Sequence, residues 1–203
     1  MLPLLSCYTL LKTTGGAGMS SFPQARQKPT YRDYLTWPAD ERWEILDGVP
    51  YNMTPSPSTI HQMVVGRFYA RLERMLAGTP CQPFVAPTDV VLSEQDVVQP
   101  DVFVVCERGK IKEAAVFGAP ELIVEVLSPH TALKDKREKK AVYERHGVKE
   151  YIIVDPVARY AERFFLNADG TYGKGEVFGP QEKLPLKVLD GLEIPLWEVF
   201  GEI

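Results

Sequence analysis

Two acidic residues lie in or next to short apolar segments that are predicted to form β-strands, and both are expected at the edge of the sheet. Asp101 follows Pro100 at the start of the apolar residues 102–105, and Glu125 lies inside the apolar run 121–127. A carboxylate in such a run must be paired or bind a cation, because an isolated buried charge is too costly to keep. If the two strands are neighbours, both carboxylates converge on one point. Such oxygen ligands suit Mg²⁺, which can activate water for attack on a phosphodiester.

A basic segment follows the second carboxylate. Residues 133–146 are predicted to form an amphipathic helix that ends at Gly147, a residue type favoured just past a helix C-terminus. The basic residues in its first turns are Lys134, Lys136, Arg137, Lys139 and Lys140. With an apolar strand on either side, the helix would complete a βαβ unit whose two strands share one sheet through a right-handed crossover. A lysine on this helix could offset charge that develops on a phosphate.

The remaining segments predict short strands and further helical pieces. Residues 60–76 repeat apolar side chains at helical spacing behind an N-cap candidate, Ser58. Two β-hairpins are predicted, one around Asp47-Gly48 and one around residues 167–170. The other expected elements are helical turns at 31–36 and 196–200 and strands at 84–85, 90–92, 102–105 and 184–194. This order of elements predicts one α+β domain with a mixed sheet.

The composition permits this chemistry without indicating it. The chain has 203 residues, a net charge of −4 and three cysteines. An acidic balance is not typical of a nucleic-acid binder, although an enzyme can hold nucleic acid over one local basic face. Cys7, Cys81 and Cys106 form no CxxC pair and show no zinc spacing. We therefore expect a reducing compartment, with neither a disulfide framework nor a structural zinc.

The first residues are expected to stand apart from the domain. Residues 2–11 are apolar, but no basic residue precedes them as in a signal peptide, and the stretch is too short to cross a membrane. Met19 is a plausible alternative initiator. We predict a poorly anchored extension at residues 1–25, a single domain at residues 26–203, no membrane association and a cytoplasmic location.

Several short motifs, in their order and spacing, resemble those of a known family. They are Trp43-Glu44-Ile45-Leu46-Asp47-Gly48, Pro55-Ser56-Pro57, Gln99-Pro100-Asp101-Val102, Glu125-Val126-Leu127-Ser128-Pro129, Lys136-Arg137-Glu138-Lys139-Lys140-Ala141-Val142-Tyr143 and Gly147-Val148-Lys149-Glu150-Tyr151 to Asp155-Pro156. Over roughly residues 31–200 the chain is similar to the Uma family of putative restriction endonucleases, within the PD-(D/E)XK nuclease superfamily. The resemblance implies a restriction-endonuclease-like αβββαβ core with a mixed central sheet. Residues 60–76 and 133–146 would be its core helices, with extra N-terminal and C-terminal β-hairpins.

The resemblance also implies roles for individual residues. Asp101 and Glu125 would be the catalytic carboxylates that bind Mg²⁺ or Mn²⁺. The superfamily places a lysine two residues after this glutamate, but here that position is Leu127. Lys139, on the following helix, would supply the amine instead. Glu44 would be a further catalytic carboxylate.

The same resemblance implies DNA as substrate and partner. Lys134, Lys136 and Arg137, at the start of the helix, would contact the DNA backbone and contribute affinity that depends on salt but not on sequence. His61, at the start of the first core helix, is a candidate additional residue of the site. A homodimer is expected, because duplex cleavage cuts two strands and one site serves one strand at a time.

Each of these residues also has a structural explanation. Pro-Asp before a strand is common turn chemistry, and Glu125 could pair with Lys139 or Arg137 without binding a metal. Glu44 could be a surface hairpin residue, and His61 could simply cap or pack. Two rival functions stay open. One is a non-catalytic nuclease-fold module for nucleic-acid binding or protein assembly, and the other is a metal-dependent hydrolase of a different phosphoester.

Overall fold

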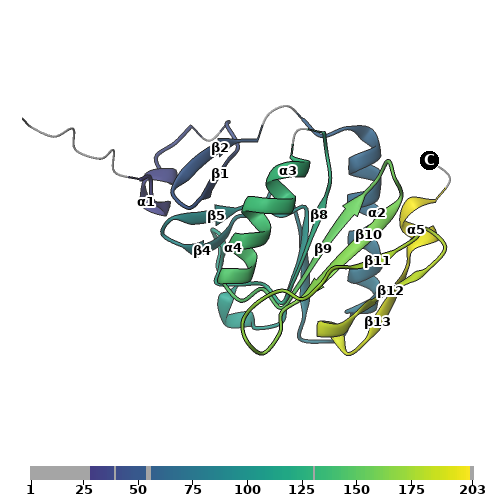
Figure 1. Ribbon diagram of the computed structural model, residues 1–203. Helices are drawn as coiled ribbons and strands as arrows, with labels where there is room; N and C mark the ends of the chain where they lie inside the picture. Colours follow the sequence, from purple (N-terminus) through teal and green to yellow (C-terminus); the bar gives the residue numbers. More distant parts are fainter. Residues whose placement is uncertain (1–27, 39, 54–55, 130, 202–203) are drawn as a thin grey trace, which may run out of the picture.

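The computed structural model describes residues 28–38, 40–53, 56–129 and 131–201. The predicted extension at residues 1–25, with its alternative start at Met19, lies outside the described residues. The elements form two larger β-sheets and a C-terminal hairpin, and helices flank the larger of the sheets (Figure 1).

The largest sheet has six strands in the order β11-β10-β9-β8-β6-β3. The strands are β3 (Gln82–Val85), β6 (Val102–Val105), β8 (Leu122–Val126), β9 (Glu150–Asp155), β10 (Tyr160–Phe165) and β11 (Glu176–Phe178). β8 and β9 run parallel, as the predicted strand–helix–strand unit requires, and the other neighbours are antiparallel. The central sheet is therefore mixed, as predicted, and β6 lies directly beside β8.

A second sheet of five strands, in the order β2-β1-β5-β4-β7, contains the predicted N-terminal hairpin. After α1 (Tyr31–Tyr34) come β1 (Trp43–Leu46), β2 (Val49–Asn52), β4 (Val90–Ser93), β5 (Asp96–Val98) and β7 (Val116–Phe117). Asp47 and Gly48 turn the hairpin with positive φ angles of 53° and 69°, which is the geometry expected of an Asp-Gly turn. β5 and β7 are not predicted, because strands this short show no period of their own.

The C-terminal part differs from its prediction. Residues 184–194 predict one strand, whereas the structure has two antiparallel strands, β12 (Lys183–Leu186) and β13 (Leu192–Pro195). Asp190 and Gly191 adopt positive φ angles of 55° and 74° and so reverse the chain between the strands. The second predicted hairpin is present as β10 and β11, and α5 (Leu196–Phe200) closes the fold as predicted.

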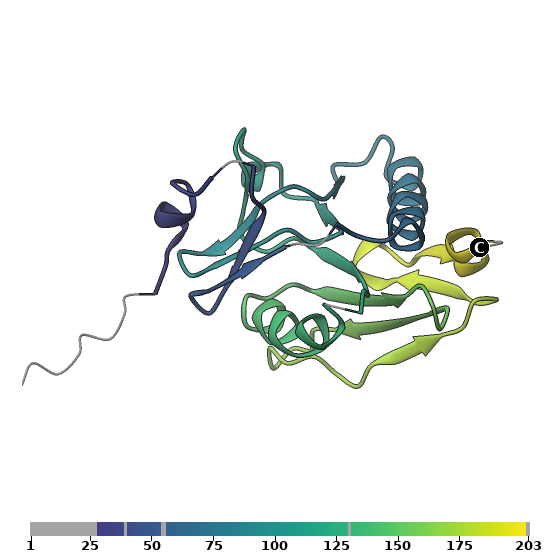
Figure 2. The ribbon, with the colours of Figure 1, turned by 90° about the horizontal axis from the view of Figure 1, so that it is seen from above.

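Helices cover both faces of the six-stranded sheet (Figure 2). α2 (Thr59–Met75) lies on one face, and the other carries a helix made of α3 (Ala132–Lys134), a π-helical turn (Asp135–Lys139) and α4 (Lys140–Arg145). Successive side chains of β8 point to opposite faces of the sheet. Leu122 and Val124 lie in the core beside α2, whereas Ile123 lies in the core beside α4. The predicted helix at 133–146 is therefore present, with a π-helical turn that its periodicity does not reveal.

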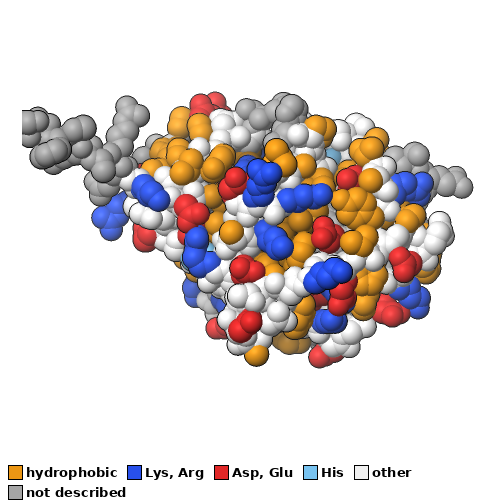
Figure 3. Space-filling view, in the orientation of Figure 1, with side chains coloured by type: hydrophobic (Ala, Val, Ile, Leu, Met, Phe, Trp, Pro, Cys, Tyr) orange, Lys and Arg blue, Asp and Glu red, His pale blue; other side chains and the backbone are white. Residues whose placement is uncertain are grey.

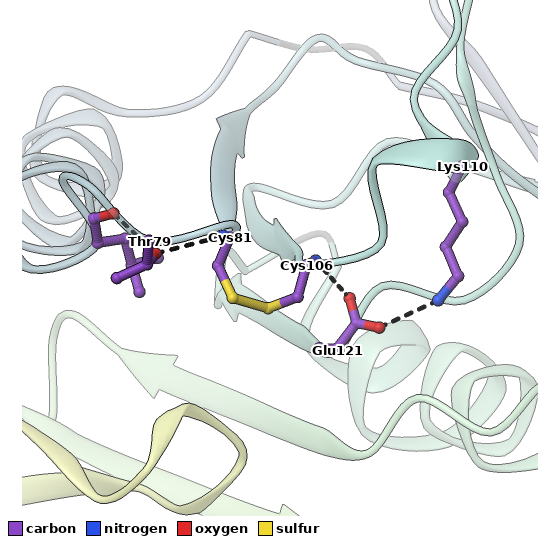
Figure 4. The surroundings of a disulfide bond; sticks show 6 residues. Thr79, Cys81, Cys106, Lys110 and Glu121 are labelled. Atoms are coloured by element: carbon purple, nitrogen blue, oxygen red, sulfur yellow. Dashed lines mark hydrogen bonds and ion pairs between the residues drawn. A yellow bond between two sulfur atoms is a disulfide. The ribbon is translucent and has the colours of Figure 1, made fainter.

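The expectation that no disulfide forms is wrong. Gln82 and Val105 are partners in the antiparallel pair β3–β6, so Cys81 and Cys106 lie opposite each other just beyond them. The two cysteines form a disulfide across a sequence separation of 25 residues (Figure 4). Spacing along the chain conceals this pair, because sheet register brings the thiols together. The cysteines therefore give no support to a reducing compartment.

The architecture as a whole is α+β, as predicted. Asp101 precedes β6 and Cys106 follows it, so the candidate site and the disulfide lie at opposite ends of this strand. Across the described ranges of the chain, no helix is both long and apolar enough to cross a membrane.

Candidate active site

The neighbouring strands β6 and β8 bring Asp101 and Glu125 together. The strands are antiparallel and Val102 pairs with Val124, so the residues one step further along face each other. The Asp101 N–H donates to Glu125 Oε2 at 3.4 Å, and the Val126 N–H donates to Asp101 Oδ2 at 2.8 Å. The two carboxylates therefore meet at one end of the sheet, as the strand order requires.

Lys139 supplies the amine nearest to this pair. Its ammonium nitrogen lies 2.9 Å from Glu125 Oε1 and 2.8 Å from Glu44 Oε1, and its side chain is buried. Leu127, at the position where the superfamily pattern has a lysine, is instead buried in the core beside α4. The helix thus brings an amine to Glu125 although the strand position is apolar.

Glu44 is a buried site residue and not a surface hairpin residue. It is 0 % exposed, although it lies on the hairpin strand β1. Its Oε1 accepts the Gln99 N–H at 3.0 Å, and its Oε2 lies 3.1 Å from the Lys134 ammonium. Through Lys139, Glu44 joins the same ion-pair network as Glu125.

Two further residues, Asp135 and Tyr143, lie in the site without having been predicted from the sequence. The Tyr143 hydroxyl donates to Glu125 Oε1 at 2.6 Å, and Asp135 Oδ1 lies 3.7 Å from the Lys139 ammonium. Both side chains are buried. Asp135 lies four residues before Lys139 and Tyr143 four residues after it. Because residues at i and i+4 share a helix face, this spacing is the signal that could have revealed them.

The π-helical turn places Asp135 at its first position. The Tyr151 hydroxyl, from β9, donates to the backbone carbonyl of Asp135 at 3.0 Å. Single π-helical turns displace the regular helix hydrogen bonds and occur often at functional sites. Here a strand side chain satisfies a carbonyl at the start of the turn and so fixes the backbone of Asp135.

His61 also reaches the site from the first turn of α2. Ser58 caps this helix, since its hydroxyl accepts the His61 N–H at 3.2 Å. The buried imidazole places Nε2 3.2 Å from Asp101 Oδ2. Burial alone would lower the pKa of His61, but the Asp101 carboxylate outweighs it and the pKa is raised. The His61 side chain thus contacts Asp101, while the capping role belongs to Ser58.

A small cavity lies among these side chains. It has a volume of about 70 Å³ and is lined by Arg42, Met53, Pro57, His61, Gln99, Asp101, Glu125, Ser128, Thr131, Asp135 and Lys139. A wider groove of about 480 Å³ shares Met53, Pro57, Ser128 and Thr131 with the cavity and extends to Lys134. The carboxylates therefore border a space for about two water molecules, next to a groove that could admit a larger ligand.

Burial and neighbouring charges set the protonation of the carboxylates. Burial raises the pKa of Glu125 to about 8; Lys139 opposes this shift, and the carboxylates of Asp101 and Asp135 reinforce it. Burial would also raise the pKa of Glu44, but the two lysine ammonium groups beside it prevail and the pKa is lowered. A cation bound next to Glu125 would favour the ionised form of its carboxyl group.

The donor set fits a hard divalent cation. Carboxylates of Asp101, Glu125 and Asp135 line one cavity, and no residue in the described ranges forms a hydrogen bond with the buried Asp135 Oδ1. Within the part of the chain that the structure describes, no three His, Cys, Asp or Glu side chains are arranged to hold a metal ion by themselves. This pattern suits Mg²⁺, which takes one or two carboxylates and keeps several water ligands.

The basic residues predicted to contact DNA have different surroundings. Lys134 is engaged in the site, with its ammonium beside Glu44 and 5.1 Å from the centroid of the Tyr51 ring. Lys136 and Arg137 are exposed, and Lys136 donates to a tyrosine hydroxyl at 3.2 Å. Figure 3 shows Lys and Arg side chains gathered over this helix, with acidic and apolar side chains among them.

Comparison with known proteins identifies the fold and the family of this chain. A crystal structure of a putative nuclease belonging to DUF820 from Anabaena variabilis matches with a TM-score of 0.70 and 17 % identity, covering 84 % of this chain and 97 % of that chain. The mixed sheet with helices on both faces is thus a restriction-endonuclease-like fold. An uncharacterized protein from Synechocystis sp. is 27 % identical over 146 residues, which are 69 % of this chain and 75 % of that protein. Residues 31–196 match the model of the Uma2 family, described as "Putative restriction endonuclease". The chain belongs to this family, so the resemblance found from the sequence is confirmed.

Proposed function

We propose that this protein is a Mg²⁺-dependent endonuclease that hydrolyses phosphodiester bonds in DNA. The observation that carries the proposal is the meeting of Asp101 and Glu125 at one end of the sheet, with the Lys139 ammonium 2.9 Å from Glu125 Oε1. Two carboxylates and an amine beside a groove are the groups that metal-assisted phosphodiester hydrolysis requires. Membership of a restriction endonuclease family supports the same class of reaction.

Each residue has a distinct role in this proposal. Asp101 and Glu125 would hold Mg²⁺ or Mn²⁺, which, when bound, supplies an activated water and neutralises charge at the leaving oxygen. Lys139 holds the Glu125 carboxylate and offers positive charge near the phosphate. Glu44 orients Lys139 through their 2.8 Å contact, and His61 orients Asp101 through its contact with Oδ2.

The DNA would lie across the wide groove and the basic helix. Lys136 and Arg137 are exposed on this helix and would contact backbone phosphates, while Lys134 lines the groove. Such contacts release counterions, so binding should weaken as the salt concentration rises. We propose a homodimer as the acting form on duplex DNA, since each subunit would contribute one site for one strand.

The test compares two nearly isosteric variants with a matched control. Asp101→Asn and Glu125→Gln each replace one carboxyl group of the site with an amide and keep its shape, whereas Glu138→Gln removes an exposed carboxylate one residue from Lys139. Purified proteins are incubated with supercoiled plasmid and with single-stranded DNA in Mg²⁺ or Mn²⁺. Wild type and Glu138→Gln should nick and linearise the DNA, and the two site variants should not. Unchanged far-UV circular dichroism would show that these variants are folded.

Other outcomes separate the rival functions. Suppose the wild type cleaves no DNA and binds no Mg²⁺ by calorimetry, even with a non-cleavable phosphorothioate oligonucleotide present. That result would contradict the proposal and favour a non-catalytic module. Hydrolysis of small phosphodiesters without preference for DNA would favour an enzyme acting on a different phosphoester.

A further inference from the structure

One oxygen of the Asp135 carboxylate is buried without a hydrogen-bond partner among the described residues. The Asp135 side chain is 2 % exposed, and Oδ1 accepts no hydrogen bond from the part of the chain that the structure describes. The ammonium of Lys139, at 3.7 Å, is beyond hydrogen-bond distance of Oδ1. Leaving a buried carboxylate oxygen without a hydrogen bond is unfavourable, and the described residues provide no hydrogen-bond donor for this oxygen.

Lys139 does not supply that partner. Its ammonium lies at hydrogen-bond distance from Glu44 Oε1 and Glu125 Oε1, at 2.8 Å and 2.9 Å. The backbone of Asp135 is in turn held by the Tyr151 hydroxyl at 3.0 Å. Asp135 is thus fixed with an unpaired oxygen in the lining of the cavity that also contains Asp101 and Glu125.

We propose that Asp135 accepts a hydrogen bond from the hydration shell of the divalent cation held by Asp101 and Glu125. The cavity of about 70 Å³ has room for about two water molecules. Among the described residues, no three carboxylates are arranged to bind a metal ion directly. Asp135 is therefore placed outside the residues that bind the cation directly, and it contacts the cation's water ligands. Mg²⁺ retains several waters, which need acceptors of this kind. This inference rests on the proposed function and adds Asp135 to it as a positioning residue.

The test measures Mg²⁺ affinity by calorimetry, with the metal alone and with a non-cleavable phosphorothioate oligonucleotide present. Asp135→Asn keeps the side-chain shape and removes the charge, and Glu138→Gln removes an exposed carboxylate from the same helix as a control. Loss of such a supporting group typically weakens metal binding about 10–100-fold, which we expect for Asp135→Asn. Glu138→Gln should bind Mg²⁺ as the wild type does. Tyr151→Phe, which leaves the carboxylate in place but frees the backbone that carries it, should weaken binding by a smaller factor.

Thermal melting without metal distinguishes a structural role. Under the proposal, metal-free Asp135→Asn melts no lower than the wild type, because the variant replaces a buried carboxylate that has one oxygen without a hydrogen bond. If this variant melts lower while Mg²⁺ affinity is unchanged in both Asp135→Asn and Tyr151→Phe, Asp135 is only a structural counter-charge for Lys139. The inference is then overturned and the proposed nuclease function stands. If the wild type binds no Mg²⁺ under either condition, both fail together.

Discussion

Replacing Lys139 with methionine should destabilise the protein strongly at neutral pH. The Lys139 ammonium lies 2.8 Å from Glu44, 2.9 Å from Glu125 and 3.7 Å from Asp135, and its side chain is 1 % exposed. Methionine has a similar length but no charge, so it leaves these carboxylates buried without their shared cation. Removing one partner of a buried ion pair costs about 3–5 kcal/mol. For a domain of this size, that loss lowers the melting temperature by roughly 6–20 °C.

The loss in Lys139→Met should shrink as the pH falls. In the wild type the pKa of Glu125 is already raised to about 8, whereas that of Glu44 is lowered. Without the Lys139 ammonium, burial raises the pKa of Glu44 above the unfolded value of about 4.3 and raises that of Glu125 further. A carboxyl group whose pKa is raised by folding binds its proton more tightly in the folded state. Stability therefore decreases as the pH rises between the unfolded and folded pKa values. The difference between wild type and variant should be largest near pH 8 and smallest near pH 5.

Urea denaturation at several pH values, followed by circular dichroism, measures this difference. Lys136→Met is the matched control, because Lys136 is exposed on the same helix; its effect should stay within about 0.5 kcal/mol. A surface ion pair would give a different result: Lys139→Met would lower the free energy of unfolding by less than about 1 kcal/mol, and by the same amount at both ends of the pH range. That result would refute the assignment of Lys139 as the shared buried cation.

Two further predictions concern regions away from the site. Asp96 accepts the Asp47 N–H at 2.8 Å and lies 2.9 Å from His146 Nε2. Burial alone would raise the pKa of Asp96, but these and other contacts outweigh burial and hold the pKa below its usual range. A depressed folded pKa stabilises the protein above the unfolded pKa of about 3.9, and this contribution is lost as the pH falls through the folded pKa. Asp96→Asn should therefore cost about 1–3 kcal/mol at neutral pH and less near pH 3, as measured by urea denaturation, and a pH-independent cost would count against this reasoning. Serine at both Cys81 and Cys106 should lower stability by about 2–4 kcal/mol in oxidising buffer and match wild type under dithiothreitol. Mg²⁺ affinity should not change, because the disulfide lies at the far end of β6, and a clear loss of affinity would contradict that separation.

The strand–helix–strand unit and its carboxylate pair could be predicted because local patterns determine them. Residues 121–127 are too apolar for an exposed strand, and a charge inside such a run demands a partner. The position of Asp101 just before a neighbouring strand then brings it to Glu125. Helical spacing located Lys139 on the intervening helix, and family resemblance singled it out there.

The remaining features depend on contacts between distant segments. The Cys81–Cys106 disulfide follows from the register of β3 on β6, which no local pattern reports. Whether His61 caps its helix or contacts Asp101 depends on how α2 packs against the sheet. The spacing of four residues between Asp135 and Lys139 does not by itself separate Asp135 from a solvated helix residue, because its role follows from which face of the helix meets the sheet.

The π-helical turn makes this helix sensitive to changes in chain length. A π-helical turn already holds one residue more than an α-helical turn, so a further residue inserted within Asp135–Lys139 would turn everything before the insertion by about 100° relative to Tyr143. Asp135 would then leave the face that looks into the cavity, even if every original side chain were conserved. Insertions in the loop that follows β11 would have no such effect. Insertions among related chains should therefore be rare in the turn and common in exposed loops.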